Sequence, residues 1–189
     1  MIEVPEWRLS LEVTLKNETN THTATYCQLA SVDSGGHPRV RTMVWRGFDE
    51  SDHGILMCTD AGSAKRFEFN QDSRAEIAWY FVDARQQFRL SGFVECLSIN
   101  GDDLNLREQL WSKLSAGAKK SFVDNSMLKK TAKDFKFETY GDVVPEFFTV
   151  IKFQPVFVKK LDLRSEPHGQ QAWQLTGLDW VKKRLVPSL

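Results

Sequence analysis

Apolar and β-branched residues gather in six short runs along the chain, and this pattern predicts β-strands. The runs are separated by glycine, proline and acidic residues, among them "SGGHP" at 34–38, which is typical of a turn. Gly92 lies inside the fifth run, where a glycine usually marks a bulge or a bend of a barrel. The expected strands are 23–33, 39–48, 54–59, 74–83, 86–98 and 147–163, the last broken by Pro155.

The first segment, 5–17, has an ambiguous pattern. Its apolar residues alternate strictly, which favours a strand, but its leucine, glutamate and lysine content and the Pro5-Glu6 start favour a helix. We expect a helix there.

Further helices and turns are indicated later in the chain. A short helix is expected to open at Ser63, and 102–122 has helical spacing, with Asp102 or Asp103 suited to the N-cap. The polar stretch 121–146 reads as a connector with a short helix, and 170–187 as a hairpin around Thr176–Gly177.

Antiparallel strands joined by hairpins, with helices inserted late, predict a mainly β (α+β) fold, a small β-barrel with flanking helices. The chain has 189 residues, 41% of them hydrophobic, which is enough for one packed core. No repeat or linker divides it, so we expect one domain over 1–189.

The charge balance limits the partners that the chain could bind. Lys plus Arg number 25 and Asp plus Glu number 25, which argues against a broad surface for nucleic acid or an anionic membrane. The N-terminus lacks a signal pattern, and no apolar run is long enough to span a bilayer, so a cytoplasmic protein is expected. Three scattered cysteines indicate reduced thiols and not a disulfide framework.

Metal and nucleophile motifs are missing from the sequence. The four histidines have no ligand-pair spacing, so loop positions are expected for them and no metal site is predicted. There is no G-x-S-x-G, H-E-x-x-H or Walker pattern, which disfavours hydrolases and nucleotide triphosphatases.

The stretch "CTDAGSAKRFEF", 58–69, places Ser63 and Lys65 where a strand gives way to a helix. A cation in the first helical turn opposes the helix dipole slightly. A bound phosphate would reverse that cost, because its oxygens could accept from helix amides, the Ser63 hydroxyl and the Lys65 ammonium together. The alternative is that Ser63 is an ordinary N-cap and Lys65 is solvated.

Four motifs occur in the order of a known family. The stretches "PRVRTMVWRGF", "ILMCTDAGSAK", "ARQQFRLSGFVE" and "WVKKRLVP" resemble those of the pyridoxamine 5'-phosphate oxidase-like proteins, which are FMN-binding split barrels. The resemblance implies a split barrel of antiparallel strands and a homodimer with FMN at its interface. It also implies a small-molecule substrate.

The resemblance also implies a set of FMN-contacting residues. Arg41 and Lys65 would hold the phosphate, with Ser63 helping to cap it, and Gln87 would reach the flavin or phosphate from a neighbouring strand. Parts of the other two stretches would lie along the flavin and ribityl chain, partly through backbone. The full set of expected cofactor-binding residues is Arg41, Thr42, Met43, Val44, Trp45, Arg46, Cys58, Thr59, Ser63, Lys65 and Gln87.

The chain departs from the family pattern at several places, among them Cys58, where an aromatic residue is common in the family. Ala64 stands where the family often has a second cation, and Leu161 stands where the B6-phosphate oxidases have a tryptophan followed by an Arg-x-His-Asp-Arg-like motif. Lys119 or Lys120 could serve a partner's phosphate, or could simply be a solvated helix end. The sequence identifies no catalytic residue.

Three functions remain open at this point: an FMN-dependent oxidoreductase of unknown substrate, a true pyridoxamine/pyridoxine phosphate oxidase, and a non-catalytic flavin- or haem-binding protein.

Overall fold

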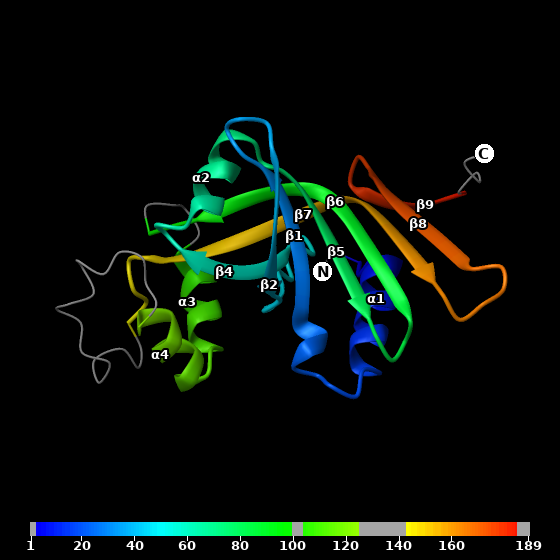
Figure 1. Cartoon of the computed structure of the whole chain (residues 1–189), viewed down its shortest axis with the longest axis horizontal. Helices are drawn as coiled ribbons and strands as arrows, with labels where there is room; N and C mark the ends of the chain where they lie inside the picture. The colour runs from blue at the N-terminus through cyan, green and yellow to red at the C-terminus, as the bar shows by residue number, and fades with distance from the viewer. Residues whose placement is uncertain (1–2, 100–103, 125–142, 185–189) are drawn as a thin grey trace.

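The computed structural model describes residues 3–99, 104–124 and 143–184, and it has a mainly antiparallel sheet with helices at both ends (Figure 1). The expected mainly β fold is confirmed. In chain order the elements are α1 (Glu6–Lys16), the 3-10 helix η1 (Thr23–Thr25), β1 (Tyr26–Val32), β2 (Pro38–Val44), β3 (Gly47–Phe48), β4 (Ile55–Asp60), α2 (Ala64–Gln71), β5 (Arg74–Phe81), β6 (Gln86–Leu97), α3 (Leu104–Ser112), α4 (Ala116–Asp124), β7 (Phe148–Asp162), β8 (Gly169–Thr176) and β9 (Asp179–Lys183).

The sheet closes on itself. Its strand order is β2-β1-β5-β6-β7-β4-β3, so β2 and β3 stand at opposite ends, yet only Trp45 and Arg46 separate them in the chain. Trp45 N donates to Thr25 O (2.8 Å), next to β1, and Arg46 N donates to Leu56 O (2.8 Å) in β4. The backbone therefore passes from a partner beside β1 to a partner in β4 between two consecutive residues. The single strand expected over 39–48 is therefore wrong. It is two strands, and Gly47 allows the break because its φ of 130° suits glycine.

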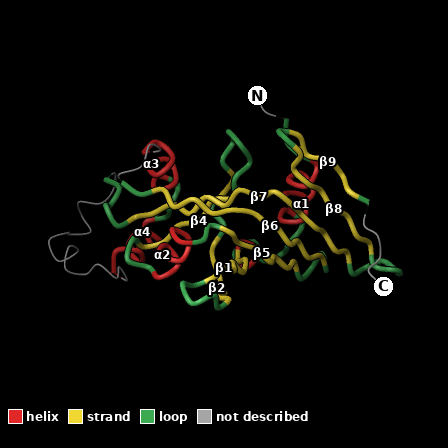
Figure 2. The backbone as a smooth tube through the Cα atoms, turned by 90° about the horizontal axis from the view of Figure 1, so that it is seen from above, coloured by secondary structure: helices red, strands yellow, loops and turns green. Residues whose placement is uncertain are grey.

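The longest strand, β7, carries both halves of the sheet. Its first part pairs with β4 and its second part with β8, so the β8–β9 hairpin extends the sheet beyond the barrel (Figures 1 and 2). The expected break at Pro155 is wrong, because β7 runs continuously through it. The register shifts between Ser91 and Gly92, opposite Pro155, and such a bulge tolerates a residue that cannot donate to the ladder.

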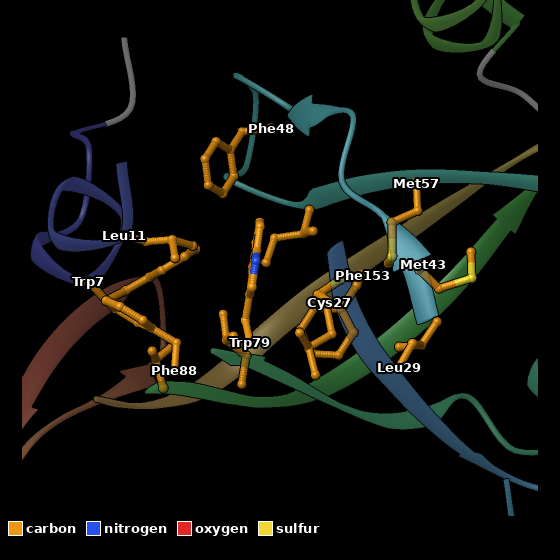
Figure 3. Packing of buried hydrophobic residues seen from close by; sticks show 14 of the residues in the cluster. Trp7, Leu11, Cys27, Leu29, Met43, Phe48, Met57, Trp79, Phe88 and Phe153 are labelled. Atoms are coloured by element: carbon orange, nitrogen blue, oxygen red, sulfur yellow. The ribbon is translucent and has the colours of Figure 1, made fainter. Parts of the chain in front are cut away.

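Helix α1 packs against the main apolar core of the sheet. Trp7 and Leu11, one turn apart, are fully buried and contribute to the main core together with the central Trp79 (Figure 3). Trp79 Nε1 donates to Ala24 O (2.8 Å), which satisfies the buried indole. The expected helix over 5–17 is confirmed, since the alternating apolar residues divide between a buried face and an exposed one, at Leu9 and Val13.

A second apolar cluster lies under α3 and α4, at the end of the sheet opposite α1 (Figures 1 and 2). The segment expected as helical over 102–122 forms two helices, because Ser115 Oγ accepts from Ala118 N (3.2 Å) and caps a new start. The hairpin expected around Gly177 is confirmed. The expected N-cap at Asp102 or Asp103 and most of the connector lie outside the described residues. None of the helices in the described segments is long and apolar enough to cross a membrane.

Candidate functional site

Two cations converge where β4 meets α2. Lys65 Nζ donates to Thr59 Oγ1 (2.9 Å) and Ser63 Oγ (2.6 Å), and Arg41 reaches the same region from β2. The Arg41 charge is close enough to Lys65 to lower its pKa. We call Arg41, Thr59, Ser63, Lys65 and Glu68 the Arg41–Lys65 cluster.

The start of α2 is arranged unusually. Ser63 occupies the N-cap position with extended backbone (φ −71°, ψ 136°) and is buried, but within the described structure its side chain makes no capping hydrogen bond. Its hydroxyl accepts from Lys65 instead. The first amides of α2 are therefore left without a side-chain cap, which is the arrangement that suits an anion at a helix start. The ordinary-cap interpretation of Ser63 is wrong.

Arg41 is fixed by two residues that the sequence interpretation missed. Its Nη1 donates to Ser31 Oγ (2.7 Å), and its Nη2 pairs with Glu68 Oε2 (2.5 Å). Ser31 Oγ also donates to the same carboxylate oxygen (2.5 Å). The hairpin register, Leu29 opposite Arg41, brings Ser31 within diagonal reach, and Glu68 lies one turn after Lys65, so both signals were present in the sequence.

The electrostatics favour an incoming anion. Burial, reinforced by the charge of Arg41, lowers the pKa of Lys65, while Glu68 and Asp60 oppose the shift. Among residues 3–99, 104–124 and 143–184, no ion pair within 4.0 Å involves Lys65. A partly desolvated ammonium held by hydroxyls alone gains more from a phosphate than a solvated one.

Cys58 lies beside this cluster on β4. Burial raises the pKa of its thiol, although Arg46 and Lys65 both lower it, so the thiol is protonated near neutral pH. These contributions place the Cys58 thiol near the side chains of Arg46 and Lys65. The structure thus brings six of the predicted residues into one region of space: Arg41, Arg46, Cys58, Thr59, Ser63 and Lys65.

The residues between Arg41 and Arg46 face different surroundings. The Thr42 side chain is exposed and Met43 is buried in the main core, where Figure 3 places it beside Leu29, so Met43 is available to a ligand through its backbone. Val44 is half-buried at the end of β2, and the Trp45 ring packs against Trp79 at 5.9 Å between centroids.

A cavity of about 210 Å³ opens beside this strand end. Trp45 and Arg46 line it, with Thr25, Leu110, Lys113 and Leu114. Trp45 Nε1 and Arg46 Nε are both buried without a hydrogen-bond partner in the described structure. Buried donors without acceptors are costly, and an acceptor-rich ring beside them would remove that cost.

Gln87 stands apart from the cluster. It pairs with Tyr80 and Leu161 at the start of β6, whereas Cys96, whose thiol pKa responds to Lys65, lies nine positions along the same strand. At about 3.3 Å per residue, roughly 30 Å separates them. Along β6, Gln87 therefore lies far from the Lys65 end of the Arg41–Lys65 cluster. Its neighbour Gln86 is buried and bonded to Thr14 and Asp162.

The structure also places Ala64, where the family often has a second cation, and Lys120, the candidate contact to a partner's phosphate. Ala64 is exposed at the start of α2, and Arg66 donates to Ala61 O (3.2 Å). Lys120 pairs with Asp124 on α4. No group of three or more His, Cys, Asp or Glu that could hold a metal occurs in the described part of the chain.

Comparison with known proteins agrees with this geometry. A family model described as "Pyridoxamine 5'-phosphate oxidase, FMN-binding domain" matches residues 4–98, which include the whole Arg41–Lys65 cluster.

Similar proteins cover nearly the whole chain. The pyridoxine/pyridoxamine 5'-phosphate oxidase 2 of Arabidopsis thaliana is 28% identical over 97% of this chain and 98% of its own length. The pyridoxine/pyridoxamine 5'-phosphate oxidase of Rhizobium meliloti strain 1021 is 34% identical over 91% and 86%. A crystal structure of a pyridoxamine 5'-phosphate oxidase-related, FMN binding protein from Nostoc punctiforme PCC 73102 superposes with a TM-score of 0.87 at 29% identity, over 99% of this chain and 100% of that one. The chain belongs to the pyridoxamine 5'-phosphate oxidase FMN-binding family.

Proposed function

We propose that this protein binds FMN through the Arg41–Lys65 cluster and works as an FMN-dependent oxidoreductase on a small-molecule substrate. The observation that carries the proposal is the convergence of Arg41, Lys65 and the Ser63 hydroxyl on the uncapped start of α2. A phosphate monoester dianion matches two cations, hydroxyl donors and free helix amides.

The cluster is arranged to orient the phosphate. Glu68 and Ser31 hold one edge of the Arg41 guanidinium, so its remaining N–H groups have a fixed direction. Lys65 is tethered by Thr59 and Ser63, and its ammonium keeps one proton to donate. Fixing both cations beforehand reduces the entropy lost when the ligand binds.

The flavin ring would lie along the break between β2 and β3. The orphan donors Trp45 Nε1 and Arg46 Nε fit the carbonyl oxygens and ring nitrogens of an isoalloxazine. Bound FMN supplies hydride and electron transfer, and the protein supplies position and charge.

A second copy of the chain would complete the site. Gln87 lies about 30 Å from Cys96 along β6, so a Gln87 contact with the same FMN requires the β6 start of a partner. We therefore propose a homodimer with FMN at its interface. We also propose that the protein works in the cytoplasm.

The test is the visible spectrum of the purified protein, followed by titration of the FMN-free protein. We expect a flavin spectrum and a 1:1 stoichiometry of FMN per chain. Lys65→Ala and Arg41→Ala should each weaken FMN binding at least tenfold. The control is Arg89→Ala, which removes an exposed ion pair between Arg89 of β6 and Glu76 of β5 and should not change FMN binding. A colourless protein that takes up no FMN, or a Soret band in place of the flavin spectrum, would contradict the proposal.

Turnover of pyridoxine or pyridoxamine phosphate is the narrower candidate function, and the names of the Arabidopsis and Rhizobium relatives favour it. Against it, Leu161 at the end of β7 replaces the family's tryptophan, and His168 lies exposed in the β7–β8 connection. An oxidase assay with both phosphates decides. FMN-loaded protein that turns over neither substrate removes this candidate and leaves the broader proposal intact.

A further inference from the structure

A hollow whose lining contains none of the Arg41–Lys65 cluster lies beside α1. It is a groove of about 600 Å³ between α1 and the ends of β6 and β7. Figures 1 and 2 show α1 and α2 over different parts of the sheet, with α1 towards the β8–β9 hairpin, so the groove and the cluster do not overlap. The volume is within the usual range for sites that bind small molecules.

A cation without an anionic partner lies in this groove. Lys160 is half-buried near the end of β7, and its Nζ donates to Ser10 Oγ (2.9 Å) and lies 5.4 Å from the centroid of the Phe88 ring. No ion pair within 4.0 Å includes Lys160 in the described ranges of the chain. Burial, with the charge of Arg164, lowers the pKa of this lysine, and Asp162 opposes the shift.

The carboxylates near the groove are already engaged. Glu6 accepts from Lys182 Nζ (2.8 Å) and Trp173 Nε1 (3.0 Å), and Asp162 accepts from Gln86 Nε2 (2.7 Å) and pairs with Arg164. Asp83, at the other edge, accepts from Thr19 N (2.7 Å). The described acidic groups thus have their own donors, and the Lys160 ammonium retains donor capacity for an incoming anion.

The opposite wall of the groove is apolar and exposed. Leu9 and Val13 lie one turn apart on the outer face of α1 and keep 50% and 58% of their surface accessible. A ligand that touches both walls needs an anionic group for Lys160 and a flat or branched apolar body for α1.

We propose that this groove binds a small organic carboxylate with an apolar or aromatic body, and that Lys160 pairs with the carboxylate while Leu9 and Val13 contact the body. The carboxylate would stabilise the charged form of Lys160, because burial removes water from the ammonium and no described carboxylate pairs with it. Burying the apolar body against α1 adds a hydrophobic contribution that grows with the apolar surface removed from water. The groove shares no lining residue with the Arg41–Lys65 cluster, so this proposal does not rest on FMN binding there.

The experiment titrates the full chain, saturated with FMN where FMN binds, with 2-naphthoate and with neutral 2-naphthamide. Binding is followed by probe fluorescence and by backbone amide shifts in ¹H–¹⁵N spectra. We expect 2-naphthoate to shift amides around Ser10, Val13 and Lys160, and to bind at least tenfold more tightly than 2-naphthamide.

Matched variants decide which residue carries the binding. Lys160→Met keeps the apolar stem and should weaken 2-naphthoate at least tenfold, whereas Lys159→Met, on the opposite face of β7, should leave it unchanged. Val13→Glu, at an exposed helix position, is a second variant that should also weaken 2-naphthoate. Equal affinity in wild type and Lys160→Met, or amide shifts confined to the Arg41–Lys65 cluster, would overturn the proposal.

Discussion

Gly92 is the described glycine at which an added methyl group would have the least room. A Cβ built on Gly92 would lie 2.0 Å from the carbonyl oxygen of Gln154, 2.8 Å from its carbonyl carbon and 2.9 Å from Pro155 Cα. Real Cβ atoms essentially never approach such neighbours closer than 3.0 Å. All three neighbours are backbone atoms of β7, the longest strand, so the clash cannot be relieved by moving a flexible side chain.

The expected cost of Gly92→Ala follows from this geometry. Widening the contact from 2.0 to 3.0 Å requires β6 and β7 to separate at the bulge, where their ladder already shifts register. Overpacking a well-packed site costs about 1–3 kcal/mol and occasionally more. Because the clash involves backbone, we expect a loss near 3 kcal/mol in the free energy of unfolding, or roughly 6–12 °C in Tm for a chain of this size.

The assay is urea denaturation with a glycine control in the same protein. Gly117→Ala is the control, because a Cβ at this α4 position meets nothing within 4 Å. It should be neutral or stabilise by up to about 1 kcal/mol, as alanine does in a helix. If Gly92→Ala unfolds at the same urea concentration as wild type, with the same slope, the close approach of β6 to β7 is wrong.

Other predictions concern charge and thiols. Burial alone would raise the pKa of Asp49, but its pairing with Lys152 (2.5 Å) holds the pKa below its usual value. The contribution of this pairing to the stability of the fold is therefore present above about pH 4 and is lost as the pH falls further. Lys152 keeps Asp52 as a partner (2.7 Å), so Asp49→Asn should cost about 1.5–3 kcal/mol at pH 7, the usual range for a hydrogen bond to a charged group, and less at pH 3, measured by urea denaturation; an equal cost at both would contradict the pairing. Burial raises the pKa of Cys27 to about 12 and that of Cys96 to about 11. Ellman's reagent at pH 8 should therefore modify fewer than one thiol per native chain but three thiols per chain in guanidinium, and rapid modification of the native chain would contradict this. Ala64→Arg, exposed at the start of α2, should tighten FMN binding about three- to tenfold, since the added cation gains more from the phosphate than the few tenths of a kcal/mol lost to the dipole; unchanged affinity would place the phosphate elsewhere.

The sequence predicted most of the strands, the first helix and the Gly92 bulge, because these depend on local patterns of apolar residues and glycine. It did not predict the division of 39–48 into β2 and β3. That division depends on which strand each backbone group meets when the sheet closes, which the local pattern does not contain. Pro155 was expected to break its strand, because the facing bulge depends on register, which only the assembled sheet fixes.

The candidate site was predicted unevenly for the same reason. The motif around Ser63 and Lys65 is contiguous, so sequence could locate it. Ser31 and Glu68 join the cluster through hairpin register and helix spacing, two signals that lie outside the contiguous motif. Gln87 was grouped with the others by family order alone, and its distance along β6 shows that order in the chain does not give proximity within one copy.

The most direct test of the account compares FMN with riboflavin, which lacks the phosphate. Fluorescence titration of the FMN-free wild type should give an affinity for FMN at least one hundredfold above that for riboflavin, because only FMN engages the cluster. In the Arg41→Ala/Lys65→Ala double variant the FMN affinity should fall close to that of riboflavin, while the riboflavin affinity stays nearly constant. A double variant that keeps the wild-type preference for FMN would contradict the assignment of the Arg41–Lys65 cluster as the phosphate site.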